Sequence, residues 1–440
     1  MKQLPHVSVL KVLANRKAIL KNPLHFHKEN FEKLGDTFRI SIPGEGKVVF
    51  SRDPDLIKQV LQKKHRFYSK SKLQTKDLAK YIGKGLLTSE GEHWRTHRRM
   101  IQPAFHAQKL RNLFGIMKSA IVEELERIKP NTDQDAFALM GDLAFQVVAK
   151  SLFSSNDIRE PMSRLQHITE ENQKMLIREM RQPYFKWWFK VSGKINRYLD
   201  MGKQGRSILN KLIEERLANR KEDNDLLDML LDATYEDGTK MSRKQLIDEV
   251  LILFTAGHET TANALAFTLY FLAKDEKLQV QLFEEVSSLG SGDYTWEDLG
   301  KLKLVMSCVK ESMRLYPPVY IIDRVALEEN TIHGLELKKG TLVLLSLFEL
   351  HKHKDFWDSP EKYTPHRFVD IDMKEASNYY YPFGAGPRMC IGNAFATYEM
   401  TMAVVELVRK YRISTKMGEV EINPMISLKP KEVILQFSPR

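Results

Sequence analysis

One of the only two cysteines in the chain, Cys390, lies in a glycine-rich loop with an arginine two positions before it. The stretch FGAGPRMCIG begins at Phe383, and the letters NAFATYEM that follow predict a helix. The free N–H groups and the dipole at the start of a helix favour a negatively charged sulfur. We expect Gly384, Gly386 and Gly392 to allow turns that a Cβ atom would block, so that backbone amides point at the sulfur. A thiolate stabilised in this way is a metal ligand.

The surroundings of Cys390 indicate which metal it would bind. No second cysteine or histidine stands near it at zinc-finger spacing, since the other cysteine is Cys308. This argues against zinc, and a single thiolate in an amide-lined loop suits the iron of haem. Taken alone, the cysteine favours a purely structural alternative, in which it is a buried and unreactive thiol in a tight turn.

A second group of polar residues interrupts the apolar run EVLILFTAGHETTANALAFTLYFLA. The run is long enough to cross a membrane, but His258 and Glu259 stand at its centre. A charge at the centre of a bilayer costs about 2.5–3.5 kcal/mol, so we favour a helix buried inside a protein. Burying Glu259 and Thr260 in such a helix costs free energy unless they have hydrogen-bond partners or a function. Alternatively, the hydroxyls of Thr260 and Thr261 bond to carbonyls of the preceding turn and bend the helix.

Two further patterns place charged residues on one helix face. In ESMRLYPP, Glu311 and Arg314 are three positions apart, and such a pair alone is usually a solvated surface pair. In HWRTHRRM, Trp94 and Arg98 are four positions apart, which alone is common in a basic surface helix. The guanidinium group of arginine matches the geometry of carboxylates through its fork of donors.

The elements that must position these residues are mostly helical. Helical periodicity runs from about Leu110 to Lys277, and a further helix follows Cys390. The sequence therefore predicts a mainly α fold with small β-sheets, as a single domain over residues 1–440 with a β-rich lobe from about 35–65 and 320–350. Strands are predicted in DTFRISIPGEGKVVFS, in TIHGLELKKGTLVLLSL and in the tail EINPMISLKPKEVILQF, with an irregular but packed segment over 356–389.

The amino-acid composition indicates where the protein is located and which kinds of partner it could bind. Two cysteines make no disulfide framework, which indicates a reducing compartment. The first twenty residues have lysines in every apolar run, so we expect neither a signal peptide nor stable membrane insertion, and hence a cytoplasmic location. The net charge of +11 fits nucleic acid, an anionic membrane, an acidic protein partner or simply a solvated surface. The segment PYFKWWFK could stack on nucleic acid or enter a membrane surface.

Read together, the motifs resemble one family. FGAGPRMCIG matches F-x-x-G-x-R-x-C-x-G in full and continues as F-A-x-x-E, which resembles the haem-binding loop of the cytochrome P-450 family. AGHETT matches A-G-x-E-T-T, and ESMRLYPP resembles the E-x-x-R element of the same family. The resemblance runs from Leu34 to the C-terminus. It implies a soluble bacterial-type haem-thiolate monooxygenase, with the haem between a long central helix and the cysteine loop.

The resemblance also implies a role for each motif residue. Cys390 would be the proximal iron ligand, and Glu259 with Thr260 would support proton delivery to bound dioxygen. The residues implied to contact the cofactor are Trp94, Arg98, Arg324, Phe383, Arg388, Gly392 and Ala256. Those implied to be structural are Glu311, Arg314 and Arg367, although TPHRF has His366 where the family commonly has glutamate. Those implied to contact substrate are Phe254, Val319, Tyr320 and Ile321, together with the segment from Phe67 to Leu87. PYFKWWFK would be an aromatic lid near the substrate entrance.

The implied cofactor is haem b (iron protoporphyrin IX), with O2 as co-substrate and a small organic molecule as substrate. We see no flavin or iron–sulfur segment in the chain, so electrons would come from a ferredoxin or flavodoxin-type donor with its reductase, and no nucleic acid partner is expected. The mainly apolar pocket candidates favour hydroxylation of a fatty acid, a terpenoid or a similar molecule. Oxidative O-demethylation of a methyl ether, with release of formaldehyde, is an alternative. An H2O2-dependent peroxygenase and a non-enzymatic haem sensor are further alternatives, which the pair Glu259–Thr260 disfavours.

Overall fold

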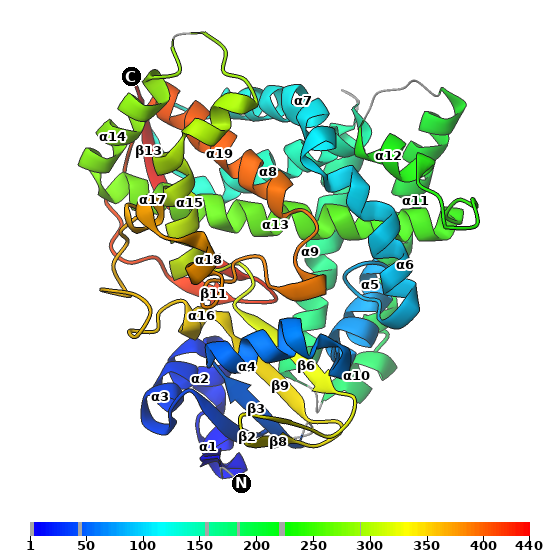
Figure 1. Ribbon diagram of the computed structural model, residues 1–440. Coiled ribbons are helices and arrows are strands. Elements are labelled where there is room, and N and C mark those ends of the chain that lie inside the picture. Colours follow the sequence, from blue (N-terminus) through cyan, green and yellow to red (C-terminus); the bar gives the residue numbers. More distant parts are fainter. Residues whose placement is uncertain (1–3, 43–45, 155–157, 183–184, 220–224, 291) are drawn as a thin grey trace. The chain divides into compact units, whose positions relative to one another are not determined.

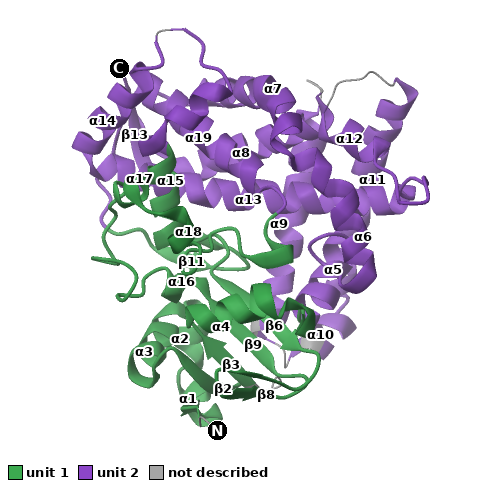
Figure 2. Ribbon diagram, in the orientation of Figure 1, with its two compact units in different colours: residues 1–71, 306–390, 419–431 green, residues 72–305, 391–418, 432–440 purple. Residues whose placement is uncertain are grey.

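The computed structural model describes residues 4–42, 46–154, 158–182, 185–219, 225–290 and 292–440 (Figure 1). The chain divides into two compact units (Figure 2). Unit 1 comprises residues 1–71, 306–390 and 419–431, and unit 2 comprises residues 72–305, 391–418 and 432–440. The single domain expected from the sequence therefore stays a prediction.

Unit 1 contains the larger sheet of the protein. Its strands are β1 (His6–Val7), β2 (Thr37–Ile42), β3 (Gly46–Ser51), β4 (Tyr68–Ser69), β6 (Ile321–Ala326) and β9 (Leu342–Ser346), in the order β1-β2-β3-β9-β6-β4. β2 and β3 pair antiparallel, which confirms the predicted hairpin, and its turn at 43–45 lies outside the described residues. Two antiparallel pairs complete the strands of the unit: β7 (Asn330–Ile332) with β8 (Leu335–Leu337), and β11 (Ile422–Pro424) with β12 (Leu428–Pro430).

Helices cover both faces of this sheet (Figure 1). The helical segments of unit 1 are α1 (Val9–Ala14), α2 (Arg16–Lys21), α3 (Leu24–Leu34), α4 (Pro54–Lys58), η1 (Gln59–Lys63), η2 (His65–Phe67), most of α15 (Lys303–Leu315), α16 (Leu347–Leu350), α17 (Arg367–Asp370), α18 (Met373–Ala376) and η7 (Gly386–Arg388). Phe31 of α3 belongs to the same apolar cluster as Phe50 of β3. Ile57 of α4 belongs to a second cluster, which contains Val49, the residue before Phe50 on β3. Successive strand residues point to opposite faces, so each face has its own core.

Unit 2 is mainly helical. Its elements are η3 (Leu73–Leu78), α5 (Ala79–Ile82), α6 (Gly91–Ile101), η4 (Gln102–Phe105), α7 (Ala107–Leu125), α8 (Ala136–Phe153), α9 (Arg159–Arg181), α10 (Lys186–Val191), α11 (Lys194–Ala218), α12 (Leu226–Asp232), α13 (Arg243–Lys274), α14 (Glu276–Ser287), η6 (Glu297–Lys301), α19 (Asn393–Lys410) and the strands β5 (Asp133–Asp135), β10 (Tyr411–Ser414) and β13 (Ile434–Pro439). The three strands form one sheet in the order β10-β13-β5. The predicted mainly α fold with small sheets is confirmed.

The long helix α13 is the central element of unit 2. Its N-terminus is capped by Ser242, whose hydroxyl accepts from the amide of Gln245 at 3.3 Å. Most of its residues are buried, which confirms the core helix favoured from the sequence. Gly257 allows α8 to come close, because a Cβ atom at this position would lie 3.1 Å from Val148. Within the described residues, α8 is the one helix long and apolar enough to cross a membrane, and 67% of that segment is buried inside the protein.

Candidate active site

The loop before Cys390 is a tight turn closed by a backbone hydrogen bond. The amide of Cys390 donates to the carbonyl of Phe383 at 2.9 Å, which folds the intervening residues into a hairpin-like loop. Cys390 is an exposed cysteine, and α19 begins three residues after it. The loop therefore presents an accessible sulfur in a fixed backbone frame.

Two of the three glycines in this loop are required by the backbone. Gly384 and Gly386 have φ angles of 72° and 69°, in the left-handed region that side chains disfavour. A Cβ atom on Gly386 would also lie 2.0 Å from the carbonyl oxygen of Leu61. The expectation for Gly392 is wrong: its φ is −90°, and a Cβ atom there would meet nothing closer than Phe105 at 3.9 Å. Gly392 precedes α19 in a conformation that any residue can adopt, so its backbone does not require glycine.

The arginines expected to hold carboxylates lie in both units. In unit 1, Arg388 is half-buried in η7, and Arg324 is buried on β6, where one guanidinium nitrogen donates to the Asp323 carbonyl at 2.7 Å. In unit 2, Trp94 and Arg98 stand one turn apart on α6 and are both half-buried. A guanidinium group carries five N–H donors in a planar fork, which suits the binding of an anionic group.

The middle of the buried helix α13 has a solvent-accessible patch, which consists of Ala256, Gly257, Glu259 and Thr260 and is called the uncovered patch below. Every residue of α13 is described, and apart from the two ends Ala256 is its one exposed residue. Gly257, Glu259 and Thr260 beside it are half-buried. The hydroxyl of Thr260 donates to the carbonyl of Ala256 at 2.9 Å, which is the back-bonding that the sequence left open. The oxygen of that hydroxyl keeps its acceptor capacity.

The residues expected to contact substrate have different surroundings. In unit 2, Phe254 is fully buried on α13 and packs edge-on against Phe145, with ring centroids 5.0 Å apart. In unit 1, Val319 is 40% exposed, and the Tyr320 hydroxyl donates to the Met425 carbonyl at 3.0 Å. Ile321 begins β6 and is half-buried against the core that contains Phe31. Packing alone accounts for Phe254, so a substrate contact at each of these positions stays a prediction.

The aromatic segment PYFKWWFK lies partly outside the described residues, at 183–184. The rest forms α10 and its approach, where Phe185, Trp187 and Trp188 are exposed. A role of this segment as a lid stays a prediction.

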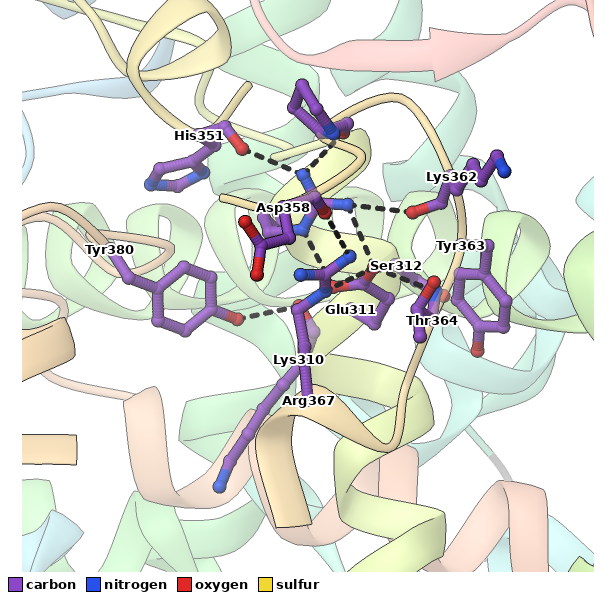
Figure 3. A network of polar contacts seen from close by, with 12 residues as sticks. Lys310, Glu311, Ser312, His351, Asp358, Lys362, Tyr363, Thr364, Arg367 and Tyr380 are labelled. Atoms are coloured by element: carbon purple, nitrogen blue, oxygen red, sulfur yellow. Dashed lines mark hydrogen bonds and ion pairs between the residues drawn. The ribbon is translucent and has the colours of Figure 1, made fainter. Parts of the chain in front are cut away.

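The structure brings Glu311, Arg314 and Arg367 together in a buried network of unit 1 (Figure 3). The two oxygens of Glu311 accept from Arg314 at 2.7 and 2.8 Å, and one of them also accepts from Arg367 at 3.1 Å. The remaining donors of Arg314 bond to the carbonyls of His351, Pro360 and Lys362. All five N–H donors of this arginine are thereby used. Such satisfaction is what makes a fully buried ion pair tolerable.

This network is linked to the chain segment that leads into the cysteine loop. The imidazole Nε2 of His351 accepts from the backbone amide of Tyr381 at 2.8 Å, two residues before Phe383. Burial and the nearby Arg314 lower the pKa of His351 to about 3, so the ring is neutral and its Nε2 can accept. The contacts from Glu311 through Arg314 and His351 to Tyr381 thus fix the start of the loop.

One buried group in unit 2, Glu249, was not recognised from the sequence, and a second, Glu399, was noted only as the glutamate of the F-A-x-x-E match. Glu249 on α13 bonds to His97 on α6, with a carboxylate oxygen 2.9 Å from the imidazole Nδ1. Glu399 is fully buried in α19, and burial raises its pKa well above the usual value. The sequence signal for Glu249 is the acidic pair Asp248–Glu249 directly before an apolar run. Acidic residues are rarely buried without a partner, so their position next to a buried segment indicates a specific contact.

The residues present fit a haem. The loop offers an accessible thiol, and its glycine cradle cannot hold side chains at Gly384 and Gly386 without strain. A soft thiolate with arginines for the propionates is the donor set of a haem-thiolate site. The uncovered patch on α13 pairs a methyl group, Ala256, with a hydroxyl and a carboxylate. Unit 1 therefore supplies the thiol and two of the arginines, and unit 2 supplies the third arginine and the polar patch, which together are the donor types of an oxygen-activating haem-thiolate protein.

Comparison with known proteins identifies the family. The model of the cytochrome P450 family matches residues 3–437, and the chain belongs to this family. It is 32% identical over 385 residues to human cytochrome P450 4A11, covering 82% of this chain and 73% of the relative. It is 26% identical over 427 residues to pentalenene oxygenase of Streptomyces avermitilis, covering 96% of this chain and 92% of the relative. The crystal structure of the cytochrome P450 CYP102L1 shares the fold, with a TM-score of 0.87 at 23% identity and full coverage of both chains.

Membership in the family establishes the class of reaction. The protein is a cytochrome P450 monooxygenase with a haem-thiolate cofactor, and it uses O2, a substrate and redox partners. The family resemblance read from the motifs is thereby confirmed.

Proposed function

We propose that this monooxygenase hydroxylates a C–H bond of an apolar small molecule of the fatty acid or terpenoid class. One oxygen atom of O2 enters the C–H bond, and two electrons and two protons reduce the other atom to water. Cys390 would hold the iron of haem b through its thiolate, and Arg98, Arg324 and Arg388 would hold the propionates. When bound, the haem supplies the redox chemistry that activates O2.

The observation that carries this proposal is the uncovered patch on α13. Ala256 is the exposed residue in the middle of this buried helix, and it offers only a methyl group to a substrate. Thr260 lies one turn further along the helix, with its hydroxyl hydrogen-bonded to the Ala256 carbonyl at 2.9 Å. Glu259 stands next to it and is half-buried. The patch thus combines an apolar contact with two groups that can hold or transfer a proton.

The support for an apolar substrate from the similar proteins comes only from the name of one relative. One relative is named as an oxygenase of pentalenene, and the name of the human relative gives no substrate. The exposed side chain of Val319 adds a second apolar surface in unit 1. We therefore choose dodecanoic acid and limonene as probes, with 4-nitroanisole as a methyl ether for comparison.

Electrons come, in this proposal, from a ferredoxin or flavodoxin-type donor and its reductase. The net charge of +11 favours an acidic electron donor, because complementary charge speeds encounter. A cytoplasmic location and the absence of stable membrane insertion stay predictions.

Titration of the three probes against the haem absorption band tests the substrate class. A bound substrate that displaces the water on iron shifts the band to shorter wavelength, and we expect this shift with dodecanoic acid or limonene. Turnover with the reconstituted donor should then give the alcohol. A shift and formaldehyde release with 4-nitroanisole alone would overturn hydroxylation in favour of O-demethylation.

The variant Thr260→Ala tests the role of the hydroxyl. We expect the ratio of product formed to electrons consumed to fall about tenfold or more, since a positioned proton donor contributes at least that much. Thr260→Ser keeps the hydroxyl and should keep most of the ratio. An unchanged ratio in Thr260→Ala would refute proton delivery by this residue. Product formed from H2O2 as fast as from O2 and electrons would indicate a peroxygenase instead.

A further inference from the structure

A buried polar cluster in unit 2 joins α13 to α6 and to the loop between α5 and α6. Its centre is Glu249, which is fully buried on α13 two turns before Ala256. One carboxylate oxygen lies 2.9 Å from Nδ1 of His97, which is 4% exposed on α6. The other oxygen accepts from the backbone amide of Leu86 at 3.0 Å. One side chain of α13 therefore contacts two other segments.

The neighbours of this cluster fix both partners in place. Nε2 of His97 lies 3.2 Å from the hydroxyl of Tyr235. The side-chain amide of Gln245 donates both to Glu249 at 3.0 Å and to the Lys84 carbonyl at 2.7 Å. With Nδ1 donating to the carboxylate, His97 is held between an acid and a phenol, which sets its ring orientation.

The loop from Gly83 to Ser89 is shaped to receive the acidic pair Asp248–Glu249. A Cβ atom on Gly85 would lie 2.5 Å from an oxygen of Glu249, so only glycine allows this approach. The adjacent Asp248 accepts from the amide of Lys84 at 3.1 Å. The loop thus has its backbone amides directed at two carboxylates on one helix.

Helix α6 has few buried residues, and His97 of this cluster is one of them. All its residues are described, and only His97 and Ile101 among them are buried. The same helix carries Trp94 and Arg98, the residues that we assign to a haem propionate. A helix with two buried side chains keeps its position chiefly through the contacts that these two make.

We propose that Glu249 is a positioning residue of the haem site. Through His97 it fixes the position of α6, and hence of Trp94 and Arg98, and through Leu86 it fixes the loop that precedes the helix. This inference rests on the propionate role of Arg98 in the proposed function, and the experiment below tests the two separately.

The experiment measures haem loss from the loaded protein to excess apomyoglobin, which requires no turnover. The variants are Glu249→Gln, His97→Leu and their combination. Each single variant is expected to lose haem about tenfold faster, the effect of one hydrogen bond to a charged group. The double variant should be no faster than the faster single variant, because both act through one contact.

Hydrogen exchange of the same loaded proteins separates positioning from general destabilisation. In Glu249→Gln, amides of 83–89 and 91–101 should exchange faster, while those in the second half of α13 keep their protection. Tyr235→Phe is a milder variant that removes only the hydroxyl at Nε2 of His97. It should fold normally and shift exchange in 91–101 in the same direction.

Two control variants keep the outcomes distinct. Arg99 on α6 pairs with Glu236, which lies in the turn between α12 and α13, and the two side chains are 67% and 81% exposed. Arg99→Gln removes this pair and should leave haem loss within about twofold. Arg98→Gln tests the propionate role directly. If Arg98→Gln speeds haem loss but Glu249→Gln and His97→Leu do not, the positioning role of Glu249 is refuted. If Arg98→Gln has no effect, the propionate assignment fails, whatever Glu249 does to exchange in α6.

Discussion

At the residue scale, the cysteine loop shows how backbone strain and ligand chemistry combine. Gly384 and Gly386 hold left-handed conformations, and the loop is closed by the hydrogen bond from Cys390 to Phe383. The motif predicted the thiol and the turn, because glycine is the common choice for such conformations. It could not show that Gly392 has an ordinary conformation, since letters at fixed spacing do not reveal φ.

Alanine at two of these glycines should have different effects on stability. Gly384→Ala meets only Ile322 at 3.6 Å, so we expect the left-handed cost of about 1–2 kcal/mol. Gly386→Ala adds a collision with the Leu61 backbone, which raises the expected total to about 3 kcal/mol or more. Urea unfolding of the two variants measures the difference. Equal midpoints would mean that the Leu61 carbonyl moves away without cost.

The buried Glu349 on α16 should make stability depend on pH. Burial raises its pKa from 4.5 to about 7, and Arg52 at 3.8 Å only partly offsets this. Between these values the folded protein holds a proton that the unfolded chain has released, so stability falls as pH rises from about 4.5 to 7. Glu349→Gln should match the unmodified protein near pH 4.5 and exceed it by up to about 3 kcal/mol above pH 7.

The companion variant Glu361→Gln should show the opposite trend. Burial acts to raise the pKa of Glu361, but Lys352 and Lys28 outweigh it and hold the value below 4.5. The ionised group therefore stabilises the fold at neutral pH, and its removal costs stability there. Urea midpoints measured from about pH 3 to 8 test both variants, because the contribution of Glu361 is lost only as pH falls below about 4.5. Parallel curves for Glu349→Gln and the unmodified protein would contradict the raised pKa.

At the element scale, one helix and an irregular segment share a buried ion network. Helix α15 contributes Glu311 and Arg314, and the segment from His351 to Arg367 contributes three carbonyls and a second guanidinium. Three-residue spacing predicted a shared face, and TPHRF predicted the third member by resemblance. The carbonyl partners could not be predicted, because irregular backbone leaves no periodic signal in the sequence.

Removing Arg314 should be far more costly than removing an exposed arginine. Arg314→Met leaves the carboxylate of Glu311 buried with part of its partners lost, so we expect a loss of about 3–5 kcal/mol. Arg95→Met breaks a pair with Glu92 whose side chains are 58% and 72% exposed, and should cost under about 0.5 kcal/mol. Urea unfolding of both variants provides the measurement. Similar small losses would show that the network contributes nothing beyond a surface pair.

At the scale of the whole molecule, charge bears on how electrons arrive. The net charge of +11 predicts that an acidic electron donor is steered to the protein, and salt screens that attraction. We expect the second-order rate of reduction by a plant-type ferredoxin to fall about tenfold or more between 10 and 500 mM salt. Stopped-flow mixing measures this rate. A rate independent of salt would argue against an acidic partner.

Some features of the fold could be predicted from the sequence, and others depend on tertiary packing. The helical middle, the strands at both ends and the buried α13 followed from periodicity and from the cost of charge in a bilayer. The cluster around Glu249 did not, because Glu249 is 163 residues from Leu86 and 152 residues from His97 in the chain and meets them only through tertiary packing. Likewise, the burial of Phe254 against Phe145 depends on α8, which no local pattern connects to α13.

The carbon monoxide spectrum of the reduced protein tests the central claim most directly. If Cys390 is the iron ligand, the unmodified protein and the control Cys308→Ser should show the red-shifted band of a thiolate-bound haem. Cys390→Ser and Cys390→His should lose that band while still folding. A red-shifted band retained by either Cys390 variant, or absent from the unmodified protein loaded with haem, would contradict the account.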